Sequence, residues 1–100
     1  MQIKSGVKAQ GLRPEMLLAV IAAEGIYREM GAECVLTSIT DGKHSTGSFH
    51  YNGLAVDIRT HNITHPEDAA ARLRSALGDE FDVVLEGNHI HVEFQPKNGE

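Results

Sequence analysis

Apolar and polar residues alternate along residues 54–59, and this period of two predicts a strand with one apolar face. Asp57 and Arg59 fall together on the polar face of that strand. The residues just before it, Tyr51-Asn52-Gly53, are typical of a turn, so the strand follows a polar loop. Loops held between strands often carry binding groups, which makes this segment a candidate site.

The same alternation occurs in two segments near the end of the chain, residues 81–85 and 90–94. Gly87 and Asn88 lie between them and suit a two-residue turn of the mirror-image type, which predicts an antiparallel hairpin. The predicted register pairs Glu86 with His89, Val84 with His91, and Asp82 with Glu93. The two histidines and Glu86 therefore gather on one face, and the apolar residues form the other.

A helix is predicted from Pro14 to about Met30, because proline suits the first helical position and apolar residues recur at helical spacing. Gly31 is placed to end this helix in a left-handed conformation. The residues expected to face the core are Leu17, Leu18, Val20, Ile21 and Met30.

A second helix is predicted over residues 66–77, with Thr64 or His65 as its cap and a glycine after its end. Residues 33–39 are rich in Val, Leu, Thr and Ile and predict a further strand, whereas residues 1–13 predict an extended or loop lead-in. Together these elements predict an α+β fold, in which a small antiparallel sheet is covered on one face by two helices.

Length and composition narrow the class of protein. One hundred residues make a single domain, 1–100, and the net charge of −5 with scattered basic residues argues against a nucleic-acid partner. The single cysteine, Cys34, excludes an intrachain disulfide and lies in an apolar run, which favours a buried structural role. No signal peptide or membrane-spanning segment is predicted, so we expect a protein made in the cytoplasm that does not enter a membrane. We also expect a monomer.

The residue types on the polar face point to a metal. His50 and Asp57 lie seven residues apart, and a second pair of imidazoles, His89 and His91, lies on a single strand face. Histidine nitrogens and carboxylate oxygens are ligands of catalytic zinc, which uses three protein groups and leaves a position for water. The sequence therefore predicts an open zinc site on the face of the sheet opposite the helices.

The segment 48–57 (SFHYNGLAVD), followed by the His-x-His strand, resembles the signature of the zinc D-alanyl-D-alanine carboxypeptidases and L-alanyl-D-glutamate endopeptidases. The hedgehog signalling domain belongs to the same superfamily. The resemblance covers about residues 37–94, and the combined spacing is far more specific than either half. It implies a fold of the hedgehog and D,D-peptidase type with zinc as cofactor.

Our assignment of zinc ligands is His50, Asp57 and His91. We prefer His91 over His89 because it lies farther from the turn, and because the second histidine of His-x-His is the ligand in the resembling families. In the alternative, Glu86 and His89 form the Glu-x-x-His pattern that the family also uses, with the glutamate as base and the histidine as ligand.

Glu86 is the candidate general base under either assignment, and His89 is then a second proton carrier or an oxyanion stabiliser. The resemblance matches Ser48 to the family's substrate-cleft serine, and places Lys43 where relatives often carry a carboxylate-binding arginine. Arg59 is a candidate to orient Asp57 or to bind a substrate carboxylate. For Lys43 and His44, a binding role and a solvated loop position are both open. His61 and His65 lie in loop and helix-cap settings that do not favour metal binding.

The activity that the resemblance implies is hydrolysis of peptide bonds in bacterial peptidoglycan, as a carboxypeptidase or an endopeptidase. The small single domain resembles a phage-encoded lysis or tail-associated enzyme, or a bacterial relative that acts on the cell wall. The expected partner is therefore a peptidoglycan peptide. The competing interpretation is a non-catalytic zinc domain that binds a partner, as hedgehog domains do.

Overall fold

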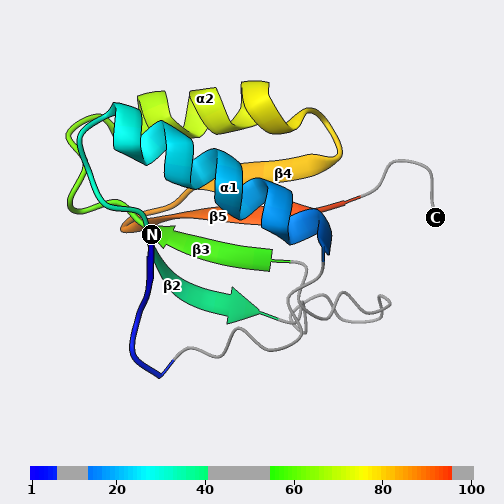
Figure 1. Cartoon of the computed structure of the whole chain (residues 1–100). Helices are drawn as coiled ribbons and strands as arrows, with labels where there is room; N and C mark the ends of the chain where they lie inside the picture. Colours follow the sequence, from blue (N-terminus) through cyan, green and yellow to red (C-terminus); the bar gives the residue numbers. More distant parts are fainter. Residues whose placement is uncertain (7–13, 41–54, 96–100) are drawn as a thin grey trace.

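The computed structural model describes residues 1–6, 14–40 and 55–95 of the chain (Figure 1). These residues form two helices and five strands. In chain order the elements are β1 (Gln2–Ile3), α1 (Pro14–Glu29), β2 (Val35–Thr40), β3 (Ala55–Arg59), α2 (Pro66–Leu77), β4 (Phe81–Leu85) and β5 (His89–Phe94). None of the described helices is long and apolar enough to cross a membrane.

The strands form one sheet in the order β1-β2-β3-β5-β4, and both helices lie on the same face of it (Figure 1). This arrangement confirms the predicted α+β class and the placement of the helices. The prediction of a purely antiparallel sheet is wrong, because β1 pairs with β2 in the parallel direction. β1 lies within the lead-in that was predicted as extended or loop, and it is held by backbone hydrogen bonds from Gln2 N to Cys34 O and from Lys4 N to Leu36 O, both 2.9 Å.

The predicted hairpin register is confirmed by the pairing of β4 with β5, in which Asp82 lies opposite Glu93 and Val84 opposite His91. Glu86 N donates to His89 O at 2.8 Å, which closes the hairpin at the predicted pair. The mirror-image turn is wrong, since Gly87 is not among the described glycines with positive φ. The turn also accepts a hydrogen bond from Thr60 N, so contacts with the neighbouring strand contribute to its shape.

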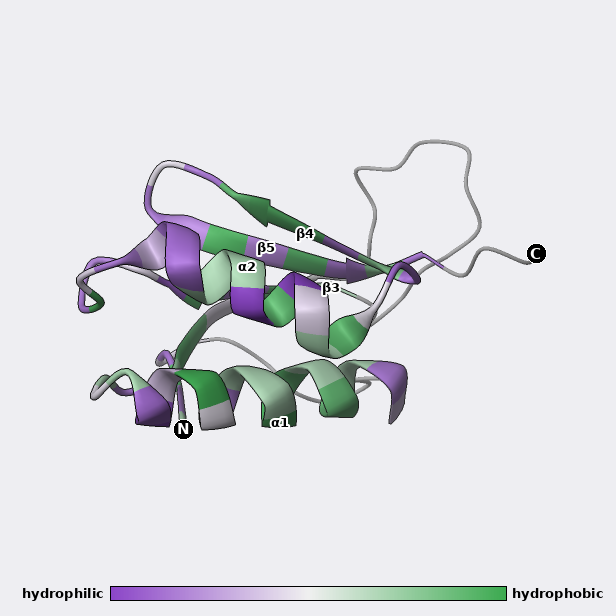
Figure 2. Ribbon diagram, turned by 90° about the horizontal axis from the view of Figure 1, so that it is seen from above, coloured by the Kyte–Doolittle hydropathy of each residue, from purple (hydrophilic) through white to green (hydrophobic). Residues whose placement is uncertain are grey.

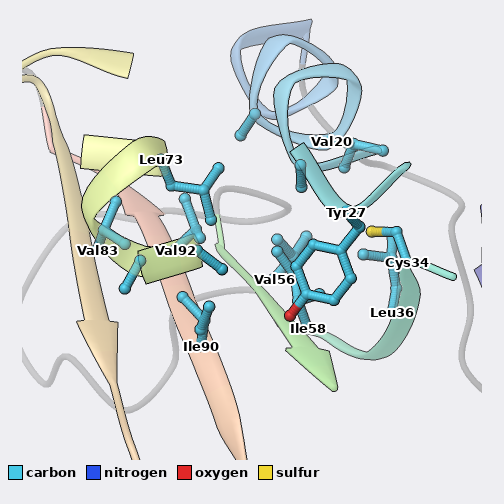
Figure 3. Packing of buried hydrophobic residues seen from close by; sticks show 14 of the residues in the cluster. Val20, Tyr27, Cys34, Leu36, Val56, Ile58, Leu73, Val83, Ile90 and Val92 are labelled. Atoms are coloured by element: carbon cyan, nitrogen blue, oxygen red, sulfur yellow. The ribbon is translucent and has the colours of Figure 1, made fainter. Parts of the chain in front are cut away.

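Alternating apolar residues of the strands point towards the helices and form the core (Figure 3). The completely buried strand residues are Val56, Ile58, Ile90 and Val92. α1 contributes Tyr27, whose side chain lies with Cys34 and Leu36 in this core (Figure 3). The Tyr27 hydroxyl donates to the carbonyl oxygen of Arg59 at 2.7 Å, which fixes the end of β3 against α1.

The predicted core face of α1 is wrong for Leu17, Leu18 and Ile21, which are 48%, 63% and 67% exposed. The buried residues of α1 are instead Met16, Ala19, Val20, Ala23 and Tyr27. The physical reason is that apolar residues lie around much of this helix, so their periodicity does not select one face (Figure 2). Its alanines, rather than its larger side chains, allow a close approach to α2 and the sheet.

The helices begin and end at the residues predicted from the sequence. Gly31 has φ 78°, the left-handed conformation predicted for the end of α1. Pro66 begins α2 and His65 is its N-cap residue, although the His65 side chain makes no capping hydrogen bond. Acidic Glu67 and Asp68 occupy the first turn of α2, where negative charge is stabilised by the helix dipole.

Candidate metal centre and its neighbours

The central strands β3 and β5 bring together the polar residues that the sequence places on one face. Their antiparallel register sets Asp57 opposite His91 and Arg59 opposite His89. Residues that face each other across an antiparallel pair lie on the same side of the sheet. The site face is therefore assembled by pairing of residues 30 and 34 positions apart, on the side away from the helices.

His91 lies between two carboxylates. Its Nδ1 is 2.7 Å from Asp57 Oδ1, and its Nε2 is 3.1 Å from Glu93 Oε1. The hydrogen bond with Asp57 raises the pKa of His91 to about 9, and the bond with Glu93 adds to this against the opposing effect of burial. The imidazole is thus held in one orientation, with Nδ1 directed to Asp57 and Nε2 to Glu93.

His89 is oriented in a similar way. Its Nδ1 is 2.7 Å from Asn88 Oδ1, while its Nε2 is 3.1 Å from Glu86 Oε1 and 3.7 Å from Asp57 Oδ1. Asp57 Oδ1 therefore lies within 4 Å of one nitrogen from each histidine. The geometry keeps both assignments of the histidine ligand open, and it places Glu86 directly beside His89.

Three of the predicted site residues, His50, Ser48 and Lys43, lie outside the described residues, as does His44. The structure therefore brings together Asp57, His91, His89, Glu86 and Arg59 from the predicted set. Within the described ranges, no group of three or more His, Cys, Asp or Glu side chains could hold a metal ion. Asp57 and His91 are neighbours across β3 and β5, and the assignment of His50, Asp57 and His91 as zinc ligands stays a prediction.

The chemistry of the described donors fits zinc. Ligands of a tetrahedral zinc ion with bonds of about 2.0–2.1 Å lie about 3.4 Å apart. Asp57 Oδ1 lies 3.7 Å from His89 Nε2, close to this separation, and it lies at the shorter hydrogen-bond distance of 2.7 Å from His91 Nδ1. Each histidine also has an oxygen acceptor for its other nitrogen, as zinc-binding histidines usually do. Asp57 with either imidazole could thus contribute two ligands.

Glu93 is the residue whose role the sequence reasoning missed. The alternation along β5 places it on the face of the histidines, but only the structure shows its carboxylate bonded to His91 Nε2. Glu93 is 8% exposed, and its second oxygen lies 3.4 Å from Gln95 Nε2. A buried carboxylate with these contacts is suited to fix the ring of His91.

The remaining residues singled out from the sequence take other positions. His65 is exposed at the start of α2, as predicted for a helix-cap setting, and His61 follows the end of β3. Cys34 is 1% exposed, and burial raises the pKa of its thiol to about 12. The predicted structural role of Cys34 is consistent with this environment.

Comparison of the chain with protein-family models, with curated proteins and with solved structures gives no match. The geometry of the described residues is therefore the basis of the functional argument.

Proposed function

We propose that this protein is a zinc-dependent peptidase that hydrolyses peptide bonds in bacterial peptidoglycan stem peptides or cross-links. Its specificity would be that of a D,D-carboxypeptidase or an L-Ala-D-Glu endopeptidase, and its target would be the cell wall. The observation that carries this proposal is the pairing of Asp57 with His91 across β3 and β5, with Glu86 and His89 beside them.

In this proposal Asp57 and His91, together with His50, hold the zinc ion. Zinc supplies Lewis acidity, which lowers the pKa of water towards neutrality and polarises a carbonyl group. Glu93 accepts a hydrogen bond from His91 Nε2 and so keeps Nδ1 directed to Asp57.

Glu86 is proposed to take the proton of the attacking water as general base. Its side chain is 49% exposed at the turn before β5, so it is accessible to a substrate, and its Oε1 lies 3.1 Å from His89 Nε2. His89 is proposed to carry that proton to the leaving amine, because its Nε2 lies 3.1 Å from Glu86 Oε1 and 3.7 Å from Asp57 Oδ1. The two residues thus form a short path for a proton along the edge of the site.

The experiment is incubation of the full chain and zinc with purified peptidoglycan, with newly released amino groups as the measurement. Glu86→Ala is expected to abolish release while zinc stays bound, because the base is lost and the ligands remain. Glu80→Ala is the matched control, since Glu80 is exposed just before β4 and should leave release unchanged.

The alternative function is that of a non-catalytic zinc domain with a hedgehog-like fold. It predicts that the unaltered chain binds zinc and releases no amino groups. Full activity of Glu86→Ala would instead support the peptidase function and show that Glu86 is not its general base.

A further inference from the structure

A pocket of about 380 Å³ adjoins the candidate metal centre on the same face of the sheet. Asp57 and His89 form part of its wall, so the pocket and the metal centre share two residues. The other lining residues are Lys4, Thr37, Ser38, Arg59, His61 and Asn88. A molecule in this pocket would therefore lie directly beside the proposed reacting groups.

Two cationic side chains line this pocket, although the chain as a whole has a net charge of −5. The described ranges contain five Lys and Arg residues: Lys4, Arg28, Arg59, Arg72 and Arg74. Arg28 and Arg72 form ion pairs with carboxylates, and Arg74 donates to the carbonyl oxygen of Val83. Lys4 and Arg59, like Arg74, form no ion pair with a carboxylate in the described part of the chain, and these two line the pocket.

The backbone positions these two cations from opposite sides. Lys4 follows β1, and its N–H donates to Leu36 O at 2.9 Å, which attaches it to the edge of β2. Arg59 ends β3, and its carbonyl oxygen accepts the hydrogen bond from the buried Tyr27 hydroxyl. Both main-chain anchors are set by the fold, and both residues line the same pocket.

A bulge in β2 adds hydroxyl groups to the same wall. The register between β2 and β3 shifts between Leu36 and Ser38, so the ladder has an extra residue at Thr37. Neighbouring residues of a regular strand point to opposite faces, yet Thr37 and Ser38 both line the pocket. Two hydroxyl groups and two cations are hydrogen-bond donors suited to carboxylate oxygens.

We infer that this pocket binds a carboxylate of the peptide substrate, and that Lys4 and Arg59 are the specificity-determining residues that hold it. The inference rests on the proposed peptidase function for the identity of the ligand as a peptide. The carboxylate is either the free C-terminus of the peptide or the side chain of an acidic residue. The first source fits an enzyme that trims ends, and the second fits an enzyme that cuts within a stem peptide.

The test is calorimetric binding of two peptide pairs to the full chain with zinc, in the Glu86→Ala background so that hydrolysis does not interfere. Acetyl-D-alanyl-D-alanine and its C-terminal amide test the free C-terminus. Acetyl-L-alanyl-D-glutamate amide and acetyl-L-alanyl-D-glutamine amide test the acidic side chain. In one pair, the charged peptide is expected to bind about tenfold more tightly or better than its neutral partner.

Lys4→Met and Arg59→Gln should each weaken binding of the charged peptide about tenfold and leave the neutral peptide unchanged. Arg72→Gln is the matched control, because it removes the same charge from α2 outside the pocket and should change neither affinity. Arg59→Lys keeps the charge and should retain part of the preference. If Arg59→Gln does not fold, the exposed Lys4 and the Arg59→Lys variant still decide the result.

Equal binding of the charged and neutral peptides in both pairs, or no binding at all, would overturn the inference. A preference that survives Lys4→Met and Arg59→Gln would also overturn it. Carboxylate-dependent binding by a chain that hydrolyses no peptidoglycan would contradict the proposed peptidase function and support carboxylate binding by the pocket. Hydrolysis without any carboxylate preference would support the peptidase function and contradict carboxylate binding by the pocket.

Discussion

The imidazole of His91 is fixed by two carboxylates, and they occupy different positions in the sheet. Asp57 comes from the neighbouring strand β3, whereas Glu93 lies two residues further along β5 itself. The two carboxylates can therefore have different roles. In the proposed site, the nitrogen that faces Asp57 binds the same metal ion as Asp57, while the other nitrogen stays bonded to Glu93. At the scale of single residues, side-chain alternation in the sequence places Asp57 and His91 on the polar faces of their strands, but it does not show that Glu93 holds the ring.

Glu93→Gln is expected to weaken zinc binding about 10- to 100-fold, because an outer acceptor orients a histidine ligand and raises its basicity. Competition with a chromogenic chelator measures this change. Asp82→Asn is the matched control, since Asp82 pairs with Glu93 in the β4–β5 ladder and its side chain is exposed. Equal zinc affinity of Glu93→Gln and the unaltered chain would show that Glu93 does not act through His91.

Cys34 is expected to be nearly inert towards thiol reagents in the folded protein. Burial raises its pKa from 9.0 to about 12, which keeps the thiol protonated, and the side chain is 1% exposed. At pH 8 the thiolate fraction is then about a thousandfold lower than for an unperturbed thiol, from the difference between these pKa values. Reaction with a disulfide reagent at pH 8, with and without denaturant, measures the ratio. Rapid reaction without denaturant would contradict it.

At the scale of elements, local patterns predict strands and helix ends better than they predict which face of a helix is buried. The hairpin register followed from alternation of the side chains and from a short turn, and both act over a few residues. α1 carries apolar residues on several sides, so its burial depends on packing against α2 and the sheet. That packing buries Ala19 and Ala23 and leaves Leu18 and Ile21 in solvent, which no period in the sequence reveals.

A pair of identical substitutions tests this assignment of faces. Leu73→Ala in α2 should lower the free energy of unfolding by about 2–5 kcal/mol, because Leu73 is completely buried and its loss leaves a cavity. Leu18→Ala in α1 should change it by no more than about 0.5 kcal/mol, because Leu18 is 63% exposed. Urea unfolding followed by circular dichroism measures both. A large loss for Leu18→Ala would mean that its side chain is packed in solution.

At the scale of the whole molecule, the order β1-β2-β3-β5-β4 decides which distant residues become neighbours. The sequence predicts most of the strands, but the parallel pairing of β1 with β2 has no local signal, because β1 has two residues and both are exposed. The pocket could not be predicted for the same reason. Lys4, Arg59 and Asn88 line one pocket only because segments far apart in the chain are brought together.

Zinc is expected to stabilise the whole fold, because its proposed ligands come from separate segments and meet only in the folded state. At a free zinc concentration about 100 times the dissociation constant, the gain is about 2.7 kcal/mol. Thermal unfolding with zinc, and again after EDTA is added, measures the gain and its reversal. Asp57→Asn should abolish the zinc-dependent gain, whereas Asp79→Asn, an exposed control before β4, should retain it. A melting temperature that zinc does not change would contradict the metal centre.

The extra residue in β2 allows this strand to fill the core on one face and to place two consecutive residues in the pocket wall on the other face. Leu36 stays buried beneath α1 while Thr37 and Ser38 both contribute to the opposite wall. Substitutions at these two hydroxyl positions are therefore expected to alter the wall of the proposed binding pocket while the hydrophobic interior stays packed.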